Sequence, residues 1–162
     1  MDTVDRARLL IGRGETDRAA RELELVLEED PTHLGALLVL ATLWLEMRED
    51  ERALALFARA TEVAPRSAEA LNGQARCCHA LGRDAEALSL AQAARSALDH
   101  EENYAQVGPV YLTLVWCLRE LGLPREAFAL AEEGLNRCSD SVLAGWADTL
   151  QEELAAAERT RC

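Results

Sequence analysis

Apolar residues recur at helical spacing along almost the whole chain, and short turns interrupt them at regular intervals. Gly14, Arg48, Gly82 and Gly122 stand where one helix must end and the next begin. Glycine suits these positions because it accepts a positive φ without steric cost. The pattern predicts helical hairpins over residues 2–12 with 16–29, 33–47 with 50–63, 67–81 with 84–98, and 109–121 with 124–137, followed by a ninth helix over 141–158.

The hairpins repeat with a fixed period. Pro31 and Pro65 are 34 residues apart (65 − 31), and the alanines Ala19, Ala53 and Ala87 repeat at the same interval. A period of about 34 residues is typical of a helical solenoid, in which each hairpin buries its apolar face only against its neighbours. We therefore expect an all-α protein built from stacked hairpins.

Small residues recur at three positions in each of the four hairpins. They are Ala7, Ala41, Ala75 and Val115; Ala19, Ala53, Ala87 and Ala127; and Val26, Ala60, Ala94 and Gly134. Small residues let paired helices approach closely. This pattern resembles the tetratricopeptide repeat family over essentially the whole chain. The resemblance implies one domain over 1–162, a right-handed superhelical solenoid with repeats at about 1–33, 34–67, 68–101 and 108–140 and a capping helix at about 141–158.

The fourth repeat departs from the period. Ala127 follows Ala87 by 40 residues rather than 34, which places an insertion of about six residues near 100–107. Gly108 and Pro109 are expected to open the next helix, since proline is well tolerated in a first turn. The last helix carries Leu143, Trp146, Leu150 and Leu154 on one face, as expected of a cap on the open end of the array.

Composition excludes several classes of partner. The 17 basic residues are all arginine, against 29 acidic ones, and the formal net charge is −12. Such a charge argues against binding to nucleic acid or to anionic membranes. The absence of lysine removes Schiff-base chemistry and any phosphate-loop lysine. Arginine in place of lysine is typical of a GC-rich bacterial gene.

The sequence favours a reduced, cytoplasmic location. No basic segment followed by a long apolar run and a cleavage site begins the chain. The longest uncharged apolar run, residues 34–45, is too short to span a bilayer. The five cysteines are odd in number and contain no C-x-x-C pair.

No residue pattern predicts a catalytic set, a cofactor or a metal. Cys77 and Cys78 are adjacent on a helix and point roughly 100° apart, so they converge poorly on one ion. Cys117 matches Cys77 in repeat register, but equivalent points on packed helices lie about 8 to 10 Å apart, beyond disulfide reach. The three histidines, His33, His79 and His100, show no zinc-binding spacing. The cysteines are therefore predicted to be structural and reduced.

The resemblance implies a concave groove lined by the first helix of each hairpin. Residues 34–45 and 110–118 are apolar on almost every side, so we expect some of their side chains to form exposed apolar walls. A polar strip would run between these walls. The walls are predicted to be Leu38, Leu45, Leu112 and Trp116, the strip Glu69, Asn72, Arg76 and His79, and further groove residues Arg8, Thr42 and Arg119. Alternatively, the cap or tight superhelical curvature covers this face.

These observations favour a non-enzymatic module that binds another protein, as a peptide or an amphipathic helix, in the concave groove. Two alternatives remain open: a small acidic secretion chaperone, and a scaffold that associates with itself. Enzymatic activity is the least supported. Neither nucleic acid nor a membrane is an expected partner.

Overall fold

The computed structural model describes residues 2–99 and 104–160 and consists, in these ranges, of α-helices without a β-strand. The elements are α1 (Thr3–Gly12), α2 (Thr16–Glu29), α3 (Leu34–Glu46), α4 (Asp50–Val63), α5 (Ala68–Ala80), α6 (Asp84–Leu98), the short 3-10 helix η1 (Tyr104–Gln106), α7 (Val107–Glu120), α8 (Pro124–Arg137) and α9 (Ser141–Arg159).

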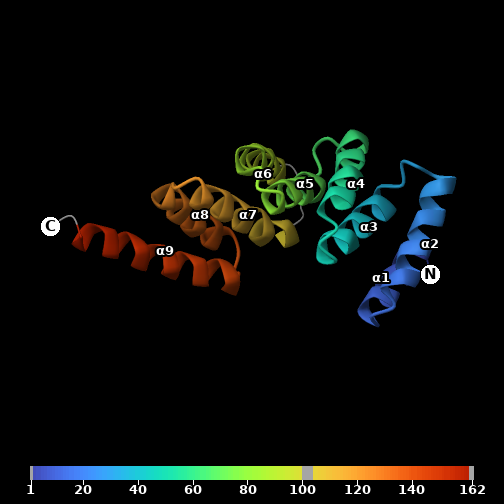
Figure 1. Ribbon diagram of the computed structural model, residues 1–162, viewed down its shortest axis with the longest axis horizontal. Helices are drawn as coiled ribbons and strands as arrows, with labels where there is room; N and C mark the ends of the chain where they lie inside the picture. The colour runs from blue at the N-terminus through green and yellow to red at the C-terminus, as the bar shows by residue number, and fades with distance from the viewer. Residues whose placement is uncertain (1, 100–103, 161–162) are drawn as a thin grey trace.

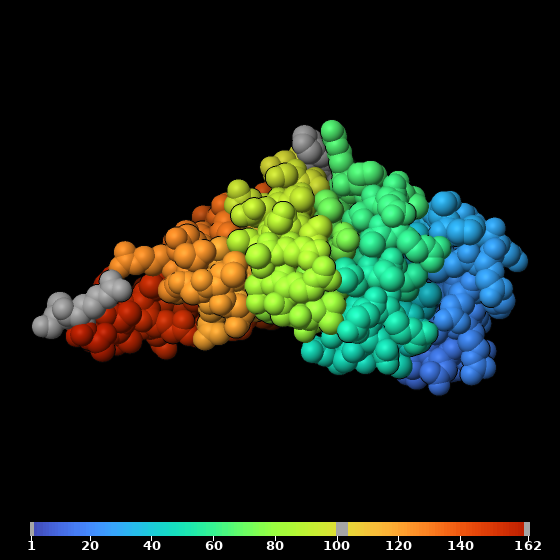
Figure 2. All heavy atoms as spheres, turned by 45° about the horizontal axis from the view of Figure 1, so that its top comes forward, coloured from blue at the N-terminus to red at the C-terminus, as the bar shows by residue number. Residues whose placement is uncertain are grey.

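The helices follow one another from one end of the molecule to the other, with the two termini at opposite ends (Figure 1). Each helix packs against the next one in sequence, and α1, α3, α5, α7 and α9 also contact one another in succession. In the space-filling view, the helices follow one another in the same order from one end of the molecule to the other (Figure 2). This arrangement is a helical solenoid, and it confirms the fold class predicted from the repeat period.

The predicted turns have the backbone geometry that the sequence indicates. Gly14, Gly82 and Gly122 have φ of 78°, 72° and 75°, and Arg48 has φ of 64°. Glycine adopts this left-handed region without steric cost, whereas arginine must accept some strain. The side chain of Arg48 is exposed, so solvent rather than packing surrounds it.

Side-chain caps fix the start of three helices. The ring of His33 accepts a hydrogen bond from the amide of Ala36, and the hydroxyl of Ser67 accepts one from Ala70. The carboxylate of Asp140 accepts bonds from the second and third residues of α9. Because a cap lies just outside the helix, the predicted starts at residues 33 and 67 are cap positions, with the helix beginning one residue later.

The predicted insertion precedes α7. Residues 100–103 of it, including His100, lie outside the described residues, as does Cys162. Tyr104–Gln106 form η1, and α7 begins at Val107, two residues before the predicted start. Gly108 and Pro109 therefore lie in its first turn, where proline needs no amide proton.

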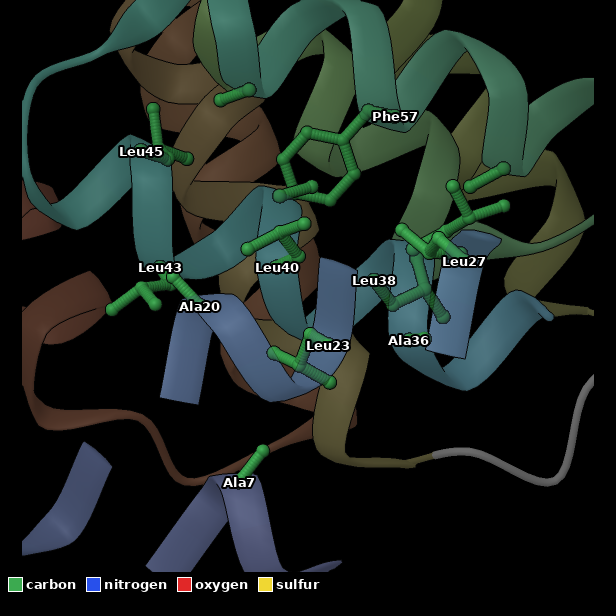
Figure 3. Close-up of a cluster of buried hydrophobic side chains, with 14 of the residues drawn as sticks. Ala7, Ala20, Leu23, Leu27, Ala36, Leu38, Leu40, Leu43, Leu45 and Phe57 are labelled. Carbon is green, nitrogen blue, oxygen red and sulfur yellow. The ribbon is translucent and has the colours of Figure 1, made fainter. Parts of the chain in front are cut away.

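Small residues allow close contact between the helices. The alanines at the recurring position of the second helices, Ala19, Ala53, Ala87 and Ala127, are completely buried. A side chain on Gly73 would overlap the ring of Phe57, so α4 and α5 touch there almost backbone to ring. An apolar cluster fills the amino-terminal half of the molecule. Figure 3 shows Phe57 within this cluster, together with Leu23 and Leu40.

A second apolar cluster fills the carboxyl-terminal half and includes Tyr111, Leu143 and Leu150. The α9 helix covers this end, since Leu143 and Leu150 are fully buried while its opposite face is exposed. Among the described residues, no helix combines the length and hydropathy needed to cross a membrane.

Candidate binding surface

The first helices of the repeats, α1, α3, α5 and α7, carry the predicted groove residues, and a hollow opens between α1 and α3. Its volume is about 220 Å³. We call it the α1–α3 hollow; its lining residues are Arg8, Ile11, Leu38, Val39, Thr42, Leu43, Glu46 and Glu69. The structure thus brings together four of the predicted groove residues, Arg8, Leu38, Thr42 and Glu69. Their role in binding stays a prediction.

Three lining residues, Val39, Leu43 and Glu46, were not predicted from the sequence as groove residues. They lie on α3, which is apolar all round, so its sequence gives no sign of which side faces the hollow. Only the packing of α1 and α5 against α3 selects that side.

Three of the four predicted wall residues are buried instead of exposed, and the fourth, Trp116, is half-buried. Leu38, Leu45 and Leu112 retain only 8%, 6% and 9% of their accessible surface. Successive first helices contact one another, and this contact covers the side chains that were expected to stand free. Most of this face is therefore covered by the chain's own helices, although the edge of Leu38 still reaches the α1–α3 hollow.

The cap engages the carboxyl-terminal part of the predicted groove. Arg119 donates a hydrogen bond to Glu153 of α9 at 2.8 Å, and its guanidinium lies 5.4 Å from the ring centroid of Trp146. The hydrogen bond to Glu153 raises the pKa of Arg119. Arg119 is therefore engaged by α9 while 37% of its side chain stays exposed, and its role in binding stays a prediction.

The polar strip on α5 is only partly available. Asn72 is buried, and its side-chain oxygen has no hydrogen-bond partner among the described residues. His79 contacts Asp84 at 2.6 Å, and its ring stacks on Trp116 with centroids 6.1 Å apart. Arg76 is half-buried, and no carboxylate in the described ranges forms an ion pair with it. Of the strip, Arg76 is the side chain best placed to meet a partner's charge.

The structure also places three possible metal ligands side by side. Atoms of His79, Asp84 and Cys117 lie within 4.8 Å of one another. They come from α5, α6 and α7, so no short spacing in the sequence could reveal them. The feature of the sequence that comes nearest to indicating this cluster is that Cys117 occupies the same position in its repeat as Cys77. Cys77, Cys78, Cys117 and Cys138 are free thiols, and the first three are buried.

A second hollow, the α2–α4 hollow, lies between second helices and has a volume of about 500 Å³. Trp44 forms part of its wall, and the guanidinium of Arg52 lies 4.0 Å from the Trp44 ring centroid. Arg59, also in the wall, donates a hydrogen bond to the carbonyl of Pro31 at 2.9 Å. This hollow was not predicted from the sequence.

Comparisons with known proteins agree with the fold. The tetratricopeptide repeat family model matches residues 10–75. A structure of Pseudomonas aeruginosa PilF has a TM-score of 0.83 at 20% identity, covering 98% of this chain and 70% of that chain. A tetratricopeptide repeat protein from Parabacteroides merdae has a TM-score of 0.73 at 21% identity, covering 97% and 59%.

MamA from Desulfovibrio magneticus, residues 41 to the end, has a TM-score of 0.71 at 16% identity, covering 83% of this chain and 73% of that chain. The sequence matches none of the curated proteins with which it was compared. At these identities the structural likeness concerns the fold. The tetratricopeptide repeat model thus accounts for the amino-terminal part of the chain, and the structural likeness extends the same solenoid fold over nearly all of it.

Proposed function

We propose that this protein is a non-enzymatic binding module of the cytoplasm, and that it seats an apolar side chain of a peptide or amphipathic helix in the α1–α3 hollow. Tetratricopeptide repeats serve in general as protein-binding modules without catalytic activity, which supports the general role. The single observation that carries the site is the hollow itself, where an apolar floor from α1 and α3 meets charged side chains from three helices.

The volume of the hollow indicates the size of the anchor. An engineered cavity of about 150 Å³ holds one benzene molecule. The α1–α3 hollow, at about 220 Å³, therefore suits one leucine, methionine or phenylalanine side chain rather than a whole helix face. Ile11, Leu38 and Val39 supply the apolar contact for such an anchor.

The charges around the hollow indicate what flanks the anchor. Arg8 has a 62% exposed side chain and lies 3.9 Å from Asp5, which is a loose ion pair. Arg8 can therefore meet a partner carboxylate, and Glu46 in the same wall can meet a basic group. Arg76 on α5, outside the wall, can meet a second carboxylate. Because such pairs mainly set orientation and association rate, the apolar anchor supplies most of the affinity.

Capture of partners from a lysate of the source organism, quantified by mass spectrometry, tests the site. We expect Thr42→Phe to fill the α1–α3 hollow and to reduce capture of the principal partner by at least 10-fold. The matched control is Ala55→Phe, which adds the same ring to the α2–α4 hollow. Circular dichroism checks that both variants are folded before their capture of partners is compared.

The opposite result identifies the α2–α4 hollow as the site and ends this proposal. Light scattering tests the scaffold alternative by measuring the mass of the protein in solution. A mass above that of one chain, which Thr42→Phe then lowers, indicates self-association through the hollow. Secretion genes beside the coding gene, together with a secreted protein among the captured partners, favour the chaperone alternative.

A further inference from the structure

Three side chains of different chemistry meet where the third and fourth repeats join. His79 lies in the last turn of α5, Asp84 is the first residue of α6, and Cys117 lies in α7. A ring nitrogen, a carboxylate oxygen and the thiol sulfur all lie within 4.8 Å of one another. The solenoid brings them together across 38 residues of sequence.

This donor set suits zinc. Imidazole, thiolate and carboxylate are its usual ligands, at about 2.0 to 2.3 Å. Tetrahedral geometry with such bonds places ligand atoms about 3.4 to 3.7 Å apart. The His79–Asp84 contact of 2.6 Å must open by about 1 Å, and a separation as wide as the 4.8 Å limit must close by about the same amount. Rotation of the Asp84 and Cys117 side chains supplies movements of this size while the His79 ring stays in place.

Access and support also fit a metal ion. Cys117 is fully buried, whereas His79 and Asp84 retain 27% and 23% side-chain exposure. An ion can therefore enter from the side of His79 and Asp84, and water can complete the tetrahedron. The ring of Trp116 stacks on that of His79 with 19° between the planes and so limits the rotation of this ligand.

The same three residue types could also suggest a nucleophilic cysteine. Burial and the charge of Asp84 raise the pKa of Cys117 to about 12, which keeps the thiol protonated. A nucleophile needs a depressed pKa and access for the substrate, and Cys117 has neither. A metal ion differs in this respect, because its own charge stabilises the thiolate.

We propose that His79, Asp84 and Cys117 bind one Zn²⁺ ion, with water as the remaining ligand, and that the ion ties α5, α6 and α7 together. On binding, the Cys117 thiol releases its proton to solvent and its sulfur bonds to the metal. This site is independent of the proposed binding function and revises the sequence-based expectation that these cysteines and histidines bind no metal.

The test is titration of the reduced, metal-free full chain with Co²⁺, which replaces zinc and absorbs strongly when bound to a thiolate. We expect one equivalent per chain and a thiolate-to-cobalt absorption band that added Zn²⁺ removes. Cys117→Ala should abolish the band and weaken Zn²⁺ binding at least 100-fold. The matched control is Cys77→Ala, a buried cysteine in the same register of the preceding repeat.

The proposal is overturned if the chain binds no stoichiometric metal, or if Cys77→Ala weakens binding as much as Cys117→Ala. His79→Leu supplies a second test that avoids cavity formation in the core, because leucine already occupies the equivalent position, Leu45. A folded His79→Leu variant should lose at least 10-fold in Zn²⁺ affinity. Unchanged affinity would exclude His79 as a ligand.

A gain of binding sharpens the assignment. Leu45→His should place a histidine beside Asp50 and Cys77, in the register of the proposed site. If these three donors suffice, the folded variant takes up a second equivalent of Co²⁺ with doubled thiolate absorption. A folded variant that still binds one equivalent shows that the constellation does not suffice and overturns the assignment.

Discussion

Two junctions of the solenoid share a register but differ at one decisive position. Asp50 and Cys77 at the junction of the second and third repeats correspond to Asp84 and Cys117 at the next one. At the first junction, Asp50 is buried and its Oδ1 has no hydrogen-bond partner among the described residues. At the second, Asp84 accepts a hydrogen bond from His79, which stands where the first junction has Leu45.

The comparison separates packing from chemistry. An aspartate at the start of a second helix, close to a buried cysteine of the next repeat, occurs at both junctions. The pair therefore belongs to the way these repeats stack. The added histidine is what converts the pair into a cluster of three metal donors, and it is the residue on which the proposed zinc site depends.

The junctions also fill their interhelical space in opposite ways. At the first, the large ring of Phe57 lies against Gly73, which has no side chain. In the same register at the second, Ala91 and Thr113 are both fully buried. A large ring against glycine at the first junction thus corresponds to alanine and threonine, whose sizes differ much less, at the second.

The largest predicted effect breaks this packing. Phe57→Ala should lower the free energy of unfolding by about 3 to 5 kcal/mol, because it removes a buried ring and leaves a cavity beside Gly73. The double variant Phe57→Ala/Gly73→Thr recreates the residue types of the second junction and should recover part of the loss. Urea unfolding followed by circular dichroism measures both changes.

Gly73→Thr alone serves as the control, and it should cost about 1 to 3 kcal/mol by overpacking against the ring. The two substitutions share one space, so their effects should not add. Additive losses would show that Phe57 and Gly73 do not complement each other, and that the two junctions are not alternative solutions to one packing problem.

These packing pairs lie in the part of the structure that the sequence predicts well. The recurrence of small residues depends on local helical spacing and a fixed period, and both are visible in one chain. Helices α2, α4, α6 and α8 have the predicted bounds, and the positive-φ turns fall at the predicted residues. The repeat boundaries themselves stay a prediction.

Exposure on the inner face was harder to predict. Whether Leu38 or Leu112 is free depends on how closely successive first helices approach, and that distance results from the whole array. The donor cluster was missed for a related reason. His79, Asp84 and Cys117 have no common spacing, and they become neighbours only when three helices stack.

A second prediction tests what the two buried thiols share. Burial, together with Asp50 in one case and Asp84 in the other, raises the pKa of Cys77 and of Cys117 to about 12. The unfolded thiols titrate near their ordinary value of about 9. Each thiol therefore contributes stability that is fully present below pH 9 and is lost as the pH rises toward 12.

Between pH 9 and pH 10 this loss should be about 1 kcal/mol for each thiol. Urea unfolding of the metal-free chain at several pH values measures it. Cys77→Ala and Cys117→Ala should each reduce the pH dependence of the unfolding free energy by the same amount. This holds whatever either substitution does to the unfolding free energy at pH 7. A flattening by only one of them would show that the two junctions bury their thiols differently.

The smallest predicted effect concerns the two aspartates in the absence of metal. Asp84→Ala removes the acceptor for the Nδ1–H of His79 and should cost about 1 kcal/mol. Asp50→Ala removes a carboxylate whose Oδ1 has no hydrogen-bond partner among the described residues and whose Oδ2 makes only a loose 4.0 Å contact with Arg48, so it should cost less. Both residues begin a helix, so the loss of a favourable charge at the helix amino terminus is common to the two variants and cancels in the comparison. The difference in unfolding free energy, measured with a chelator present, compares the close His79–Asp84 contact with the loose Arg48–Asp50 contact. Equal costs would mean that His79 adds nothing to the stability of its junction without a metal ion.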